Sequence, residues 1–313
     1  MPTRTSFTCA FITALAAALT TPSLHADTEP PARTVAQVLE QSPATDWRPL
    51  HAEHTLLMEL PQGPVILELA PRFAPEHVAN IRTLVRQGYF DGLAVLRVQD
   101  NYVTQWGDPQ ADRPEQARAL GQAKTKLPAE FSVPLKGLPL TPLPDTDGWA
   151  PLTGFVDGMP VAADPQTGRA WIAHCYGVVG AGRGMPPDSS NGSSLYTVIG
   201  TPARGLDLNI TAVGRVLQGM QHLAALPRGT GNLGFYEDAQ QRLPIQRVRL
   251  LADLPAADRP ALEVLRTDSA TWSALLEARR VRREGWFVHS PRHINLCNAV
   301  VPVRPASTTA LKP

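Results

Sequence analysis

Excess charge of either sign is missing from this chain, in which 29 lysine and arginine residues balance 28 aspartate and glutamate residues. Without a global positive field, the protein has no general attraction for nucleic acid or for an anionic membrane. Long apolar runs are also missing beyond the N-terminus, so we expect no membrane insertion of the mature chain. Nucleic acid and lipid are therefore not expected partners.

Cysteine is rare, since only Cys9, Cys175 and Cys297 are present. Loss of an N-terminal segment would remove Cys9 and leave an even pair. In an oxidising compartment that pair can form a disulfide, which the chain-entropy model values at ~4 kcal/mol for so long a loop. Two buried free thiols are the alternative, and the sequence leaves both open.

Residue patterns for metal or nucleotide binding are missing as well. His51 and His54 lie close together, but no carboxylate or cysteine arrangement completes a zinc site around them. The glycine-rich residues 180–184 lack the pattern of a phosphate-binding loop. We therefore expect no metal and no other cofactor.

The N-terminus has the organisation of an export signal. Arg4 supplies a positive start, residues 7–19 form an apolar core, and Ala26 ends a stretch suited to cleavage. The core is too short to span a bilayer. We expect a signal peptide over residues 1–26 and a periplasmic or secreted protein, whereas a buried first helix is disfavoured by the polar, proline-rich continuation.

Proline is abundant: the 31 prolines are about twice the usual share of roughly 5%. Because proline does not fit inside helices or central strands, much of the chain must be loop. The remaining apolar periodicity predicts strands over 54–60, 65–69, 93–98, 171–179 and 245–251, with helices over 75–85 and 218–226.

These elements suggest a division of the chain into segments. After the signal peptide we expect a connector over 27–51, with a short helix that Thr34 and Gln37 cap. A β domain over 52–253 follows, interrupted by a Pro/Gly-rich insertion over 110–168 that contains a hairpin near 154–161. A C-terminal helical extension over 254–313 has a short helix opened by Asp258 and a second over 268–283.

The stretch over residues 92–109 carries the main functional signal. Arg97 is the one long charged side chain in an apolar strand, and Tyr102, Val103 and Gln105 follow a short Asp-Asn turn. Aromatic, apolar and amide groups can thus return beside the guanidinium. Taken alone, Arg97 is better explained as an edge residue or half of an ion pair.

This stretch resembles the active-site segment of cyclophilin-type peptidyl-prolyl isomerases in the order of its parts: a strand with Arg97, a turn, Tyr102-Val103, Gln105 and Gly-Asp. The family reads Phe-His-Arg, then Phe-Met, then Gln-Gly-Gly-Asp, so Leu96 replaces the histidine and Trp106 a glycine. The likeness extends from about residue 54 to about residue 253, interrupted by the insertion.

Two further stretches resemble family signatures. In the first, Gly182 falls on an alanine that contacts peptide, Ser194 on a glutamine, and Tyr196 on the phenylalanine that floors the proline pocket. In the second, Leu206 falls on the pocket leucine, while Gly205 replaces a tryptophan.

The resemblance implies a mainly β fold, namely a closed eight-stranded antiparallel β-barrel capped by two helices, with the partly helical extension outside it. It implies peptidyl-prolyl cis-trans isomerase activity on proline-containing unfolded or extended polypeptides. Arg97 would donate a hydrogen bond to the prolyl nitrogen, and Tyr102, Val103, Tyr196 and Leu206 would hold the proline ring. A monomer is favoured.

The departures at Leu96, Ser194 and Gly205 keep a second hypothesis open, a cyclophilin-shaped peptide-binding module or chaperone with little turnover. Arg97 together with Gln105 favours the enzyme, since a pure binder has no use for a buried donor aimed at nitrogen. An unrelated barrel hydrolase is disfavoured, because no catalytic triad or carboxylate pair assembles in the sequence.

Overall fold

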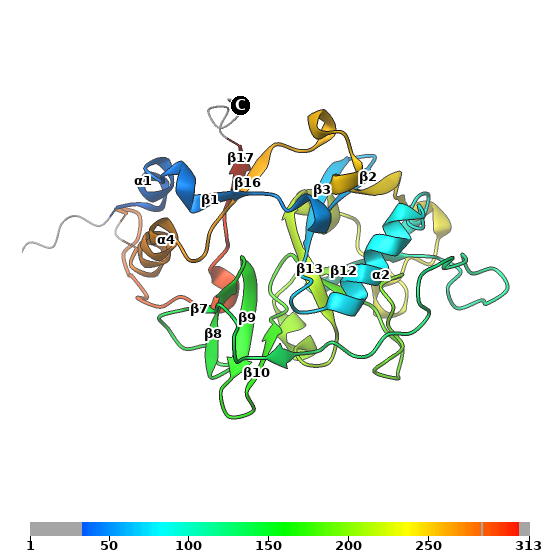
Figure 1. Cartoon of the computed structure of the whole chain (residues 1–313), viewed down its shortest axis with the longest axis horizontal. Coiled ribbons are helices and arrows are strands. Elements are labelled where there is room, and N and C mark those ends of the chain that lie inside the picture. The colour runs from blue at the N-terminus through cyan, green and yellow to red at the C-terminus, as the bar shows by residue number, and fades with distance from the viewer. Residues whose placement is uncertain (1–32, 283, 307–313) are drawn as a thin grey trace, which may run out of the picture. The chain divides into compact units, whose positions relative to one another are not determined.

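A computed structural model of the chain describes residues 33–282 and 284–306 (Figure 1). The signal peptide expected over residues 1–26 lies outside the described residues, as does the start of the connector. Over the described ranges, no helix has both the length and the apolar character needed to cross a membrane.

The largest element is a nine-stranded antiparallel sheet with the order β14-β4-β5-β12-β11-β13-β3-β2-β15. Its strands are β2 (Thr55–Leu60), β3 (Gly63–Leu69), β4 (Ala94–Gln99), β5 (Val103–Gly107), β11 (Val178–Ala181), β12 (Leu195–Val198), β13 (Ala212–Gln218), β14 (Leu243–Pro244) and β15 (Arg247–Leu250).

The mainly β fold is as expected, but the sheet is not a closed ring of eight strands. It is open, and its two end strands β14 and β15 are separated in the chain by only Ile245 and Gln246. The Ile245 N–H donates to the Leu93 carbonyl at 2.7 Å, whereas the Gln246 N–H donates to the Glu59 carbonyl at 2.9 Å. The chain changes partner here. The strand expected over 245–251 is present as the shorter β15 at one end of the sheet, while β14, just before it, lies at the other end.

Two helices pack against this sheet, α2 (Pro75–Arg86) and α3 (Met220–Ala224). Proline suits the first turn of α2, where its missing N–H costs nothing. Val78, Ile81 and Leu84 form the apolar stripe of α2 and are buried in the same cluster as Leu223 of α3 and the strand residues. The helices expected over 75–85 and 218–226 are therefore present, the second one shorter than expected.

The insertion, together with residues 169–172 directly after it, forms a second sheet, called the insertion sheet, with the order β6-β10-β9-β8-β7. A two-residue turn at Asp157 and Gly158, both with positive φ, joins β8 to β9 where the hairpin was expected. The strands are β6 (Val133–Pro134), β7 (Thr141–Pro142), β8 (Leu152–Val156), β9 (Met159–Asp164) and β10 (Arg169–Ile172).

The single strand expected over 171–179 is wrong. Its first part is β10 of the insertion sheet, and its last part begins β11 of the main sheet. Between them the Val178 N–H donates to the Cys175 carbonyl at 3.0 Å, and Gly177 has φ +82°. Because of this turn, one apolar run contributes a strand to each of two sheets. The density of apolar residues alone does not predict such a division.

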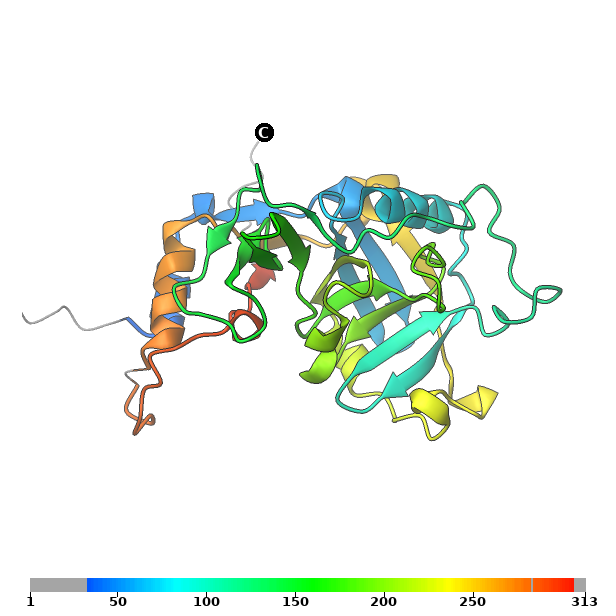
Figure 2. The same ribbon diagram turned by 90° about the horizontal axis from the view of Figure 1, so that it is seen from below.

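The connector and the C-terminal extension together form a third unit. The strand β1 (Trp47–Pro49) pairs with β16 (Leu262–Leu265), which pairs in turn with β17 (Val303–Pro305). The helix α1 (Val35–Glu40) has the expected capping box of Thr34 and Gln37, and contacts α4 (Ala270–Arg280). The insertion sheet lies between α4 and the main sheet (Figures 1 and 2).

The helix expected after Asp258 is wrong, because residues 262–265 form β16 and pair on both sides with distant strands. The helix expected over 268–283 is α4, which Ser269 caps through the Trp272 N–H. Short 3-10 helices complete the described chain: η1 (Ala44–Asp46), η2 (Ala52–His54), η3 (Pro202–Leu206), η4 (Asn232–Gly234), η5 (Ala239–Gln241), η6 (Leu251–Asp253), η7 (Ala256–Asp258) and η8 (Leu296–Asn298).

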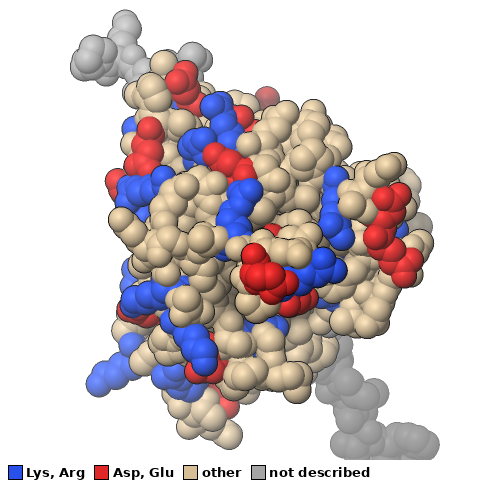
Figure 3. All heavy atoms as spheres, turned by 90° about the vertical axis from the view of Figure 1, so that its right-hand side faces the viewer, with Lys and Arg blue, Asp and Glu red and all other residues tan. Residues whose placement is uncertain are grey.

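Charge is evenly spread over the face shown in Figure 3, where acidic and basic side chains are interspersed. Among the described residues, many charged side chains form ion pairs, as in Arg247 with Glu59 at 2.6 Å and Arg86 with Asp253 at 2.9 Å. Surface pairs of this kind contribute little to stability.

Candidate active site

Arg97 lies on β4, opposite Gln105 of β5, at a register irregularity of the ladder between these strands. Three acceptors hold its guanidinium. The Nε–H donates to the Leu233 carbonyl at 2.6 Å, Nη1 donates to Gln105 Oε1 at 3.1 Å, and Nη2 donates to Gln99 Oε1. The side chain is half-buried and fixed in direction, so it is not a freely moving surface charge.

Aromatic rings flank the same guanidinium. The Arg97 Cζ lies 5.5 Å from the ring centroid of Phe235 and 6.0 Å from that of Tyr102, within reach of a cation–π contact. Burial lowers the pKa of Arg97, and the nearby hydroxyls of Tyr102 and Tyr196 partly oppose this shift. The ordinary pKa of arginine is so high that the guanidinium stays charged at any physiological pH.

The residues expected to form the site surround one cavity of about 610 Å³. It brings together β4, β5, β12, η3 and the loop that follows β11. Seven expected residues line it: Arg97, Tyr102, Val103, Gln105, Gly182, Tyr196 and Leu206. Ser194 stands behind Gln105, whose amide nitrogen donates to Ser194 Oγ at 3.0 Å.

Strand register explains how these side chains meet. Tyr196 of β12 pairs with Gln105 of β5, and Val198 pairs with Val103 two residues further along. Tyr196 and Val103 are buried, whereas Leu206 at the end of η3 is half-buried. A methyl group at Gly182 would lie 3.2 Å from Ser194 Oγ. A larger side chain there would therefore crowd the hydrogen bond between Ser194 and Gln105.

Five further residues line the cavity without having been expected there: Gln99, Arg183, Ile210, Leu233 and Phe235. Leu233 and Phe235 are 56% and 39% exposed, so they form an apolar rim. Phe235 also makes an isolated β-bridge to Arg97. In the sequence, Phe235 is simply an aromatic residue after a glycine-rich loop. Nothing in that pattern indicates contact with a strand more than 130 residues earlier.

Cys175 and Cys297 are joined in a disulfide, with an S–S distance of 2.08 Å. Of the two alternatives that the sequence left open, the structure has the bonded pair. The bond ties the turn between β10 and β11 to η8 in the C-terminal extension. Cys175 directly follows His174, whose Nε2 lies 2.9 Å from the hydroxyl oxygen of Tyr196.

Known proteins resemble this chain over the β domain. A family model described as cyclophilin type peptidyl-prolyl cis-trans isomerase/CLD matches residues 55–250. Probable peptidyl-prolyl cis-trans isomerases of Brucella suis and Brucella abortus are 29% and 28% identical over 184 residues, which cover 57% of this chain and 74% of theirs.

A solved structure resembles a larger part of the chain. The cyclophilin AquaCyp293 from Hirschia baltica is 25% identical and superimposes with a TM-score of 0.67. The match covers 88% of this chain and 99% of that protein, so it extends beyond the sheet that carries the cavity.

Proposed function

Because this chain belongs to the cyclophilin-type peptidyl-prolyl cis-trans isomerase family, we propose that it accelerates rotation about X-Pro bonds with Arg97 as the donor to the prolyl nitrogen. One observation carries this proposal. Arg97 lines an apolar cavity while three acceptors fix its direction.

The reaction needs no bond to be made or broken. Amide resonance gives the C–N bond double-bond character and a rotation barrier of about 18–20 kcal/mol. At the twisted transition state the resonance is lost, so the prolyl nitrogen becomes pyramidal and basic. A hydrogen-bond donor aimed at this nitrogen therefore stabilises the transition state more than the ground state.

Arg97 has donors left for that task. Of the five N–H groups of an arginine, Leu233, Gln105 and Gln99 use three, so one remains on each Nη. Because the acceptors fix the plane of the guanidinium, these two N–H groups keep a constant direction. No reorganisation is then needed when the nitrogen lone pair develops.

The cavity supplies the anchor for the proline ring. Tyr102, Val103, Tyr196 and Leu206 offer apolar surface on several sides, and the exposed Leu233 and Phe235 extend it at the rim. A ring held in this socket stays still while the residue before proline swings. The substrates would be proline-containing unfolded or extended polypeptides.

We also propose that the protein works outside the cytoplasm, in the periplasm or secreted, on exported polypeptides. Two features support this. The N-terminal residues have the organisation of an export signal, and disulfides such as Cys175–Cys297 persist in oxidising compartments.

A peptide-binding module with little turnover is the second candidate. It is favoured by the site itself, since a Cβ atom at Gly205, where the family has a tryptophan, would meet no atom within 4 Å, and Leu96 replaces a histidine. Both candidates predict peptide binding, and only the first predicts that rotation depends on Arg97.

A protease-coupled assay on a proline tetrapeptide separates the two. We expect Arg97→Ala to lower kcat/KM by at least about tenfold, equivalent to ~1.4 kcal/mol of barrier, with a smaller change in peptide affinity. Arg266→Ala serves as the matched control, because Arg266 is an exposed partner of Asp268 in the C-terminal extension. Equal rates in wild type and Arg97→Ala would favour the binding module.

A further inference from the structure

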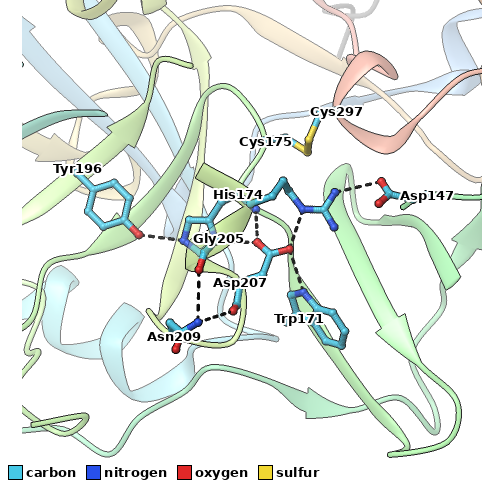
Figure 4. Close-up of polar contacts among 10 residues, drawn as sticks. Asp147, Trp171, His174, Cys175, Tyr196, Gly205, Asp207, Asn209 and Cys297 are labelled. Carbon is cyan, nitrogen blue, oxygen red and sulfur yellow. Dashed lines mark hydrogen bonds and ion pairs between the residues drawn. A yellow bond between two sulfur atoms is a disulfide. The ribbon is translucent and has the colours of Figure 1, made fainter. Parts of the chain in front are cut away.

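The floor of the proline cavity carries a buried hydroxyl that needs a partner. Tyr196 is 4% exposed, and an unpaired hydroxyl at such a site is costly. Its oxygen lies 2.9 Å from Nε2 of His174, and the two rings are stacked at an interplanar angle of 13° (Figure 4). His174 is itself 1% exposed and does not line the proline cavity.

Asp207 orients this imidazole. The Asp207 Oδ1 lies 3.0 Å from His174 Nδ1 and accepts the His174 backbone N–H at 2.9 Å. Since a carboxylate only accepts, Nδ1 is the protonated nitrogen, and a neutral ring then presents Nε2 as an acceptor. With this neutral ring, the phenol of Tyr196 is the donor in its bond to His174.

The carboxylate is secured from its other side. Asp207 Oδ2 accepts from Arg204 Nε at 2.7 Å and from Trp171 Nε1 at 3.2 Å (Figure 4). Burial alone would raise the pKa of Asp207, but hydrogen bonding to His174 and the charge of Arg204 outweigh it and lower that pKa. Asp207 thus remains an acceptor for the imidazole.

The backbone opposite Tyr196 is matched to its hydroxyl. Gly180 pairs with Tyr196 across the β11–β12 ladder. A methyl group at Gly180 would lie 2.2 Å from the Tyr196 hydroxyl oxygen and 2.3 Å from Cζ, so no side chain fits there. The space at Gly180 and the partner at His174 both suit a tyrosine in one fixed position.

We infer that His174, oriented by Asp207, is a positioning residue that fixes the Tyr196 ring as the floor of the proline pocket. The same aspartate directly follows Leu206, which lines the pocket, and its carboxylate also binds Arg204 of η3, the 3-10 helix that Leu206 ends. This inference rests on the proposed function, because it explains how the same cavity keeps its shape. His174 acts through Tyr196 and does not touch the substrate.

Loss of this support should weaken ring binding more than it slows rotation. The floor contacts the pyrrolidine ring in both the ground state and the transition state, so its loss is a loss of uniform binding. The expected signature is a raised KM with kcat little changed. Loss of Arg97 would give the opposite signature, a lowered kcat.

The test compares two variants that replace the imidazole by an amide. His174→Asn keeps a polar atom near the place of Nδ1 but loses Nε2, whereas His174→Gln keeps an amide near the place of Nε2. We expect His174→Asn to raise KM about fivefold, corresponding to ~1 kcal/mol for one net hydrogen bond, and His174→Gln to restore most of it. Equal KM values in wild type and a folded His174→Asn variant would overturn the inference.

A double-mutant cycle with Tyr196→Phe shows whether His174 acts through the phenol. We expect the KM effect of His174→Asn to shrink to less than about twofold once the hydroxyl is gone, since the two changes remove one interaction. An undiminished effect in the Tyr196→Phe background would contradict the inference, because His174 would then act by another route.

Nitrogen-15 NMR of the wild-type imidazoles tests the arrangement without any variant or activity. We expect His174 in the tautomer protonated at Nδ1, and Tyr196→Phe should shift its Nε2 resonance. The opposite tautomer, or no shift, would overturn the inference even if the protein is an active isomerase. If turnover is absent, the proposed function fails, while peptide affinity and these resonances still decide the role of His174.

Discussion

Gln105 accepts a hydrogen bond from Arg97 Nη1 at 3.1 Å while its own amide nitrogen donates to Ser194 Oγ at 3.0 Å. The carboxamide is thus held at both ends, and its oxygen faces the guanidinium. Strand pairing sets this relationship, because Arg97 and Gln105 are partners across the β4–β5 ladder. The direction of the proposed catalytic donor therefore depends on Gln105.

Replacement of Gln105 by leucine should slow rotation while the proline socket persists. Leucine has a similar volume but no acceptor, so Arg97 keeps only two of its three fixing bonds. We expect Gln105→Leu to lower kcat/KM by about fivefold to tenfold, equivalent to roughly 1–1.4 kcal/mol, mostly through kcat. The protease-coupled assay measures this change.

Ser194→Ala provides the graded control for that prediction. It removes the hydrogen bond from the Gln105 amide nitrogen but leaves the Gln105 oxygen as an acceptor for Arg97. We therefore expect a smaller loss of kcat/KM, about twofold. A larger loss in Ser194→Ala than in Gln105→Leu would show that Ser194 does not act through the oxygen of Gln105.

Gly180 should tolerate no side chain. A methyl group there would meet the Tyr196 hydroxyl at 2.2 Å, and both residues lie inside paired strands that cannot move apart freely. Overpacking of this kind costs about 1–3 kcal/mol, so we expect Gly180→Ala to lower the free energy of unfolding by that amount in urea denaturation.

A second glycine gives the matched control for overpacking. Gly205 lies in η3 beside the same cavity, but a methyl group there would meet no atom within 4 Å. We expect Gly205→Ala to leave the free energy of unfolding within about 0.5 kcal/mol of wild type. Similar losses in both variants would indicate a backbone effect and not a clash with Tyr196.

Much of the site could be predicted from sequence because its residues follow each other in order within short segments. Arg97, Tyr102, Val103 and Gln105 lie within nine residues, so one strand–turn–strand unit brings them together. The apolar run over residues 93–98 predicts the first strand, and the Asp-Asn turn after it predicts that the following residues return beside Arg97. Resemblance to a known family then supplied the contributions of Tyr196 and Leu206.

The parts that could not be predicted depend on long-range contacts. Phe235 reaches Arg97 through an isolated bridge, and its glycine-rich loop carries no periodicity that would reveal it. The segment 262–265 pairs on both sides with strands from opposite ends of the chain, and no local propensity shows this. The role of His174 could not be predicted, because a lone histidine beside a cysteine forms no recognisable pattern until the fold places Asp207 and Tyr196 around it.

The disulfide should stabilise the protein by linking the C-terminal extension to the rest of the chain. The bond closes a loop with a sequence separation of 122 residues. In the chain-entropy model, such a loop restricts the unfolded state by ~4–5 kcal/mol. We expect the double variant Cys175→Ser, Cys297→Ser to unfold at a clearly lower urea concentration, and reductant to have the same effect on wild type.

A thiol titration checks the premise of that prediction. Removal of the expected signal peptide takes Cys9 with it, so the denatured exported protein without reductant should show no reactive thiol. Two reactive thiols would contradict the bonded state. An unchanged urea midpoint in the double variant would show that the extension is held by packing alone.

Glu130 of the insertion should make the protein sensitive to acid. Its carboxylate accepts the backbone N–H groups of Glu76 and His77 at 3.0 and 2.9 Å, and lies 2.7 Å from His77 Nδ1, so it caps α2 from outside the helix. Burial would raise the pKa of Glu130, but the hydrogen bonds from His77 and from these N–H groups outweigh it and lower that pKa.

The sign of the pH effect follows from this lowered pKa. The folded state binds the proton more weakly than the unfolded state, whose pKa lies near the ordinary value of 4.5. The stabilisation is therefore complete above about pH 4.5 and is lost as the pH falls through the folded-state pKa. Urea denaturation at pH 7 and at several values below 4.5 measures this loss.

Glu130→Gln separates the contribution of this carboxylate from those of other acids. The amide oxygen can still accept one N–H but carries no charge, so we expect lower stability at pH 7 and a shallower decline of stability below pH 4.5 than in wild type. Glu115→Gln is the control, since Glu115 is an exposed acid of the same insertion. If Glu130→Gln and Glu115→Gln lose stability with pH as steeply as wild type, the acid sensitivity arises elsewhere, and Glu130 contributes to α2 only as a neutral cap.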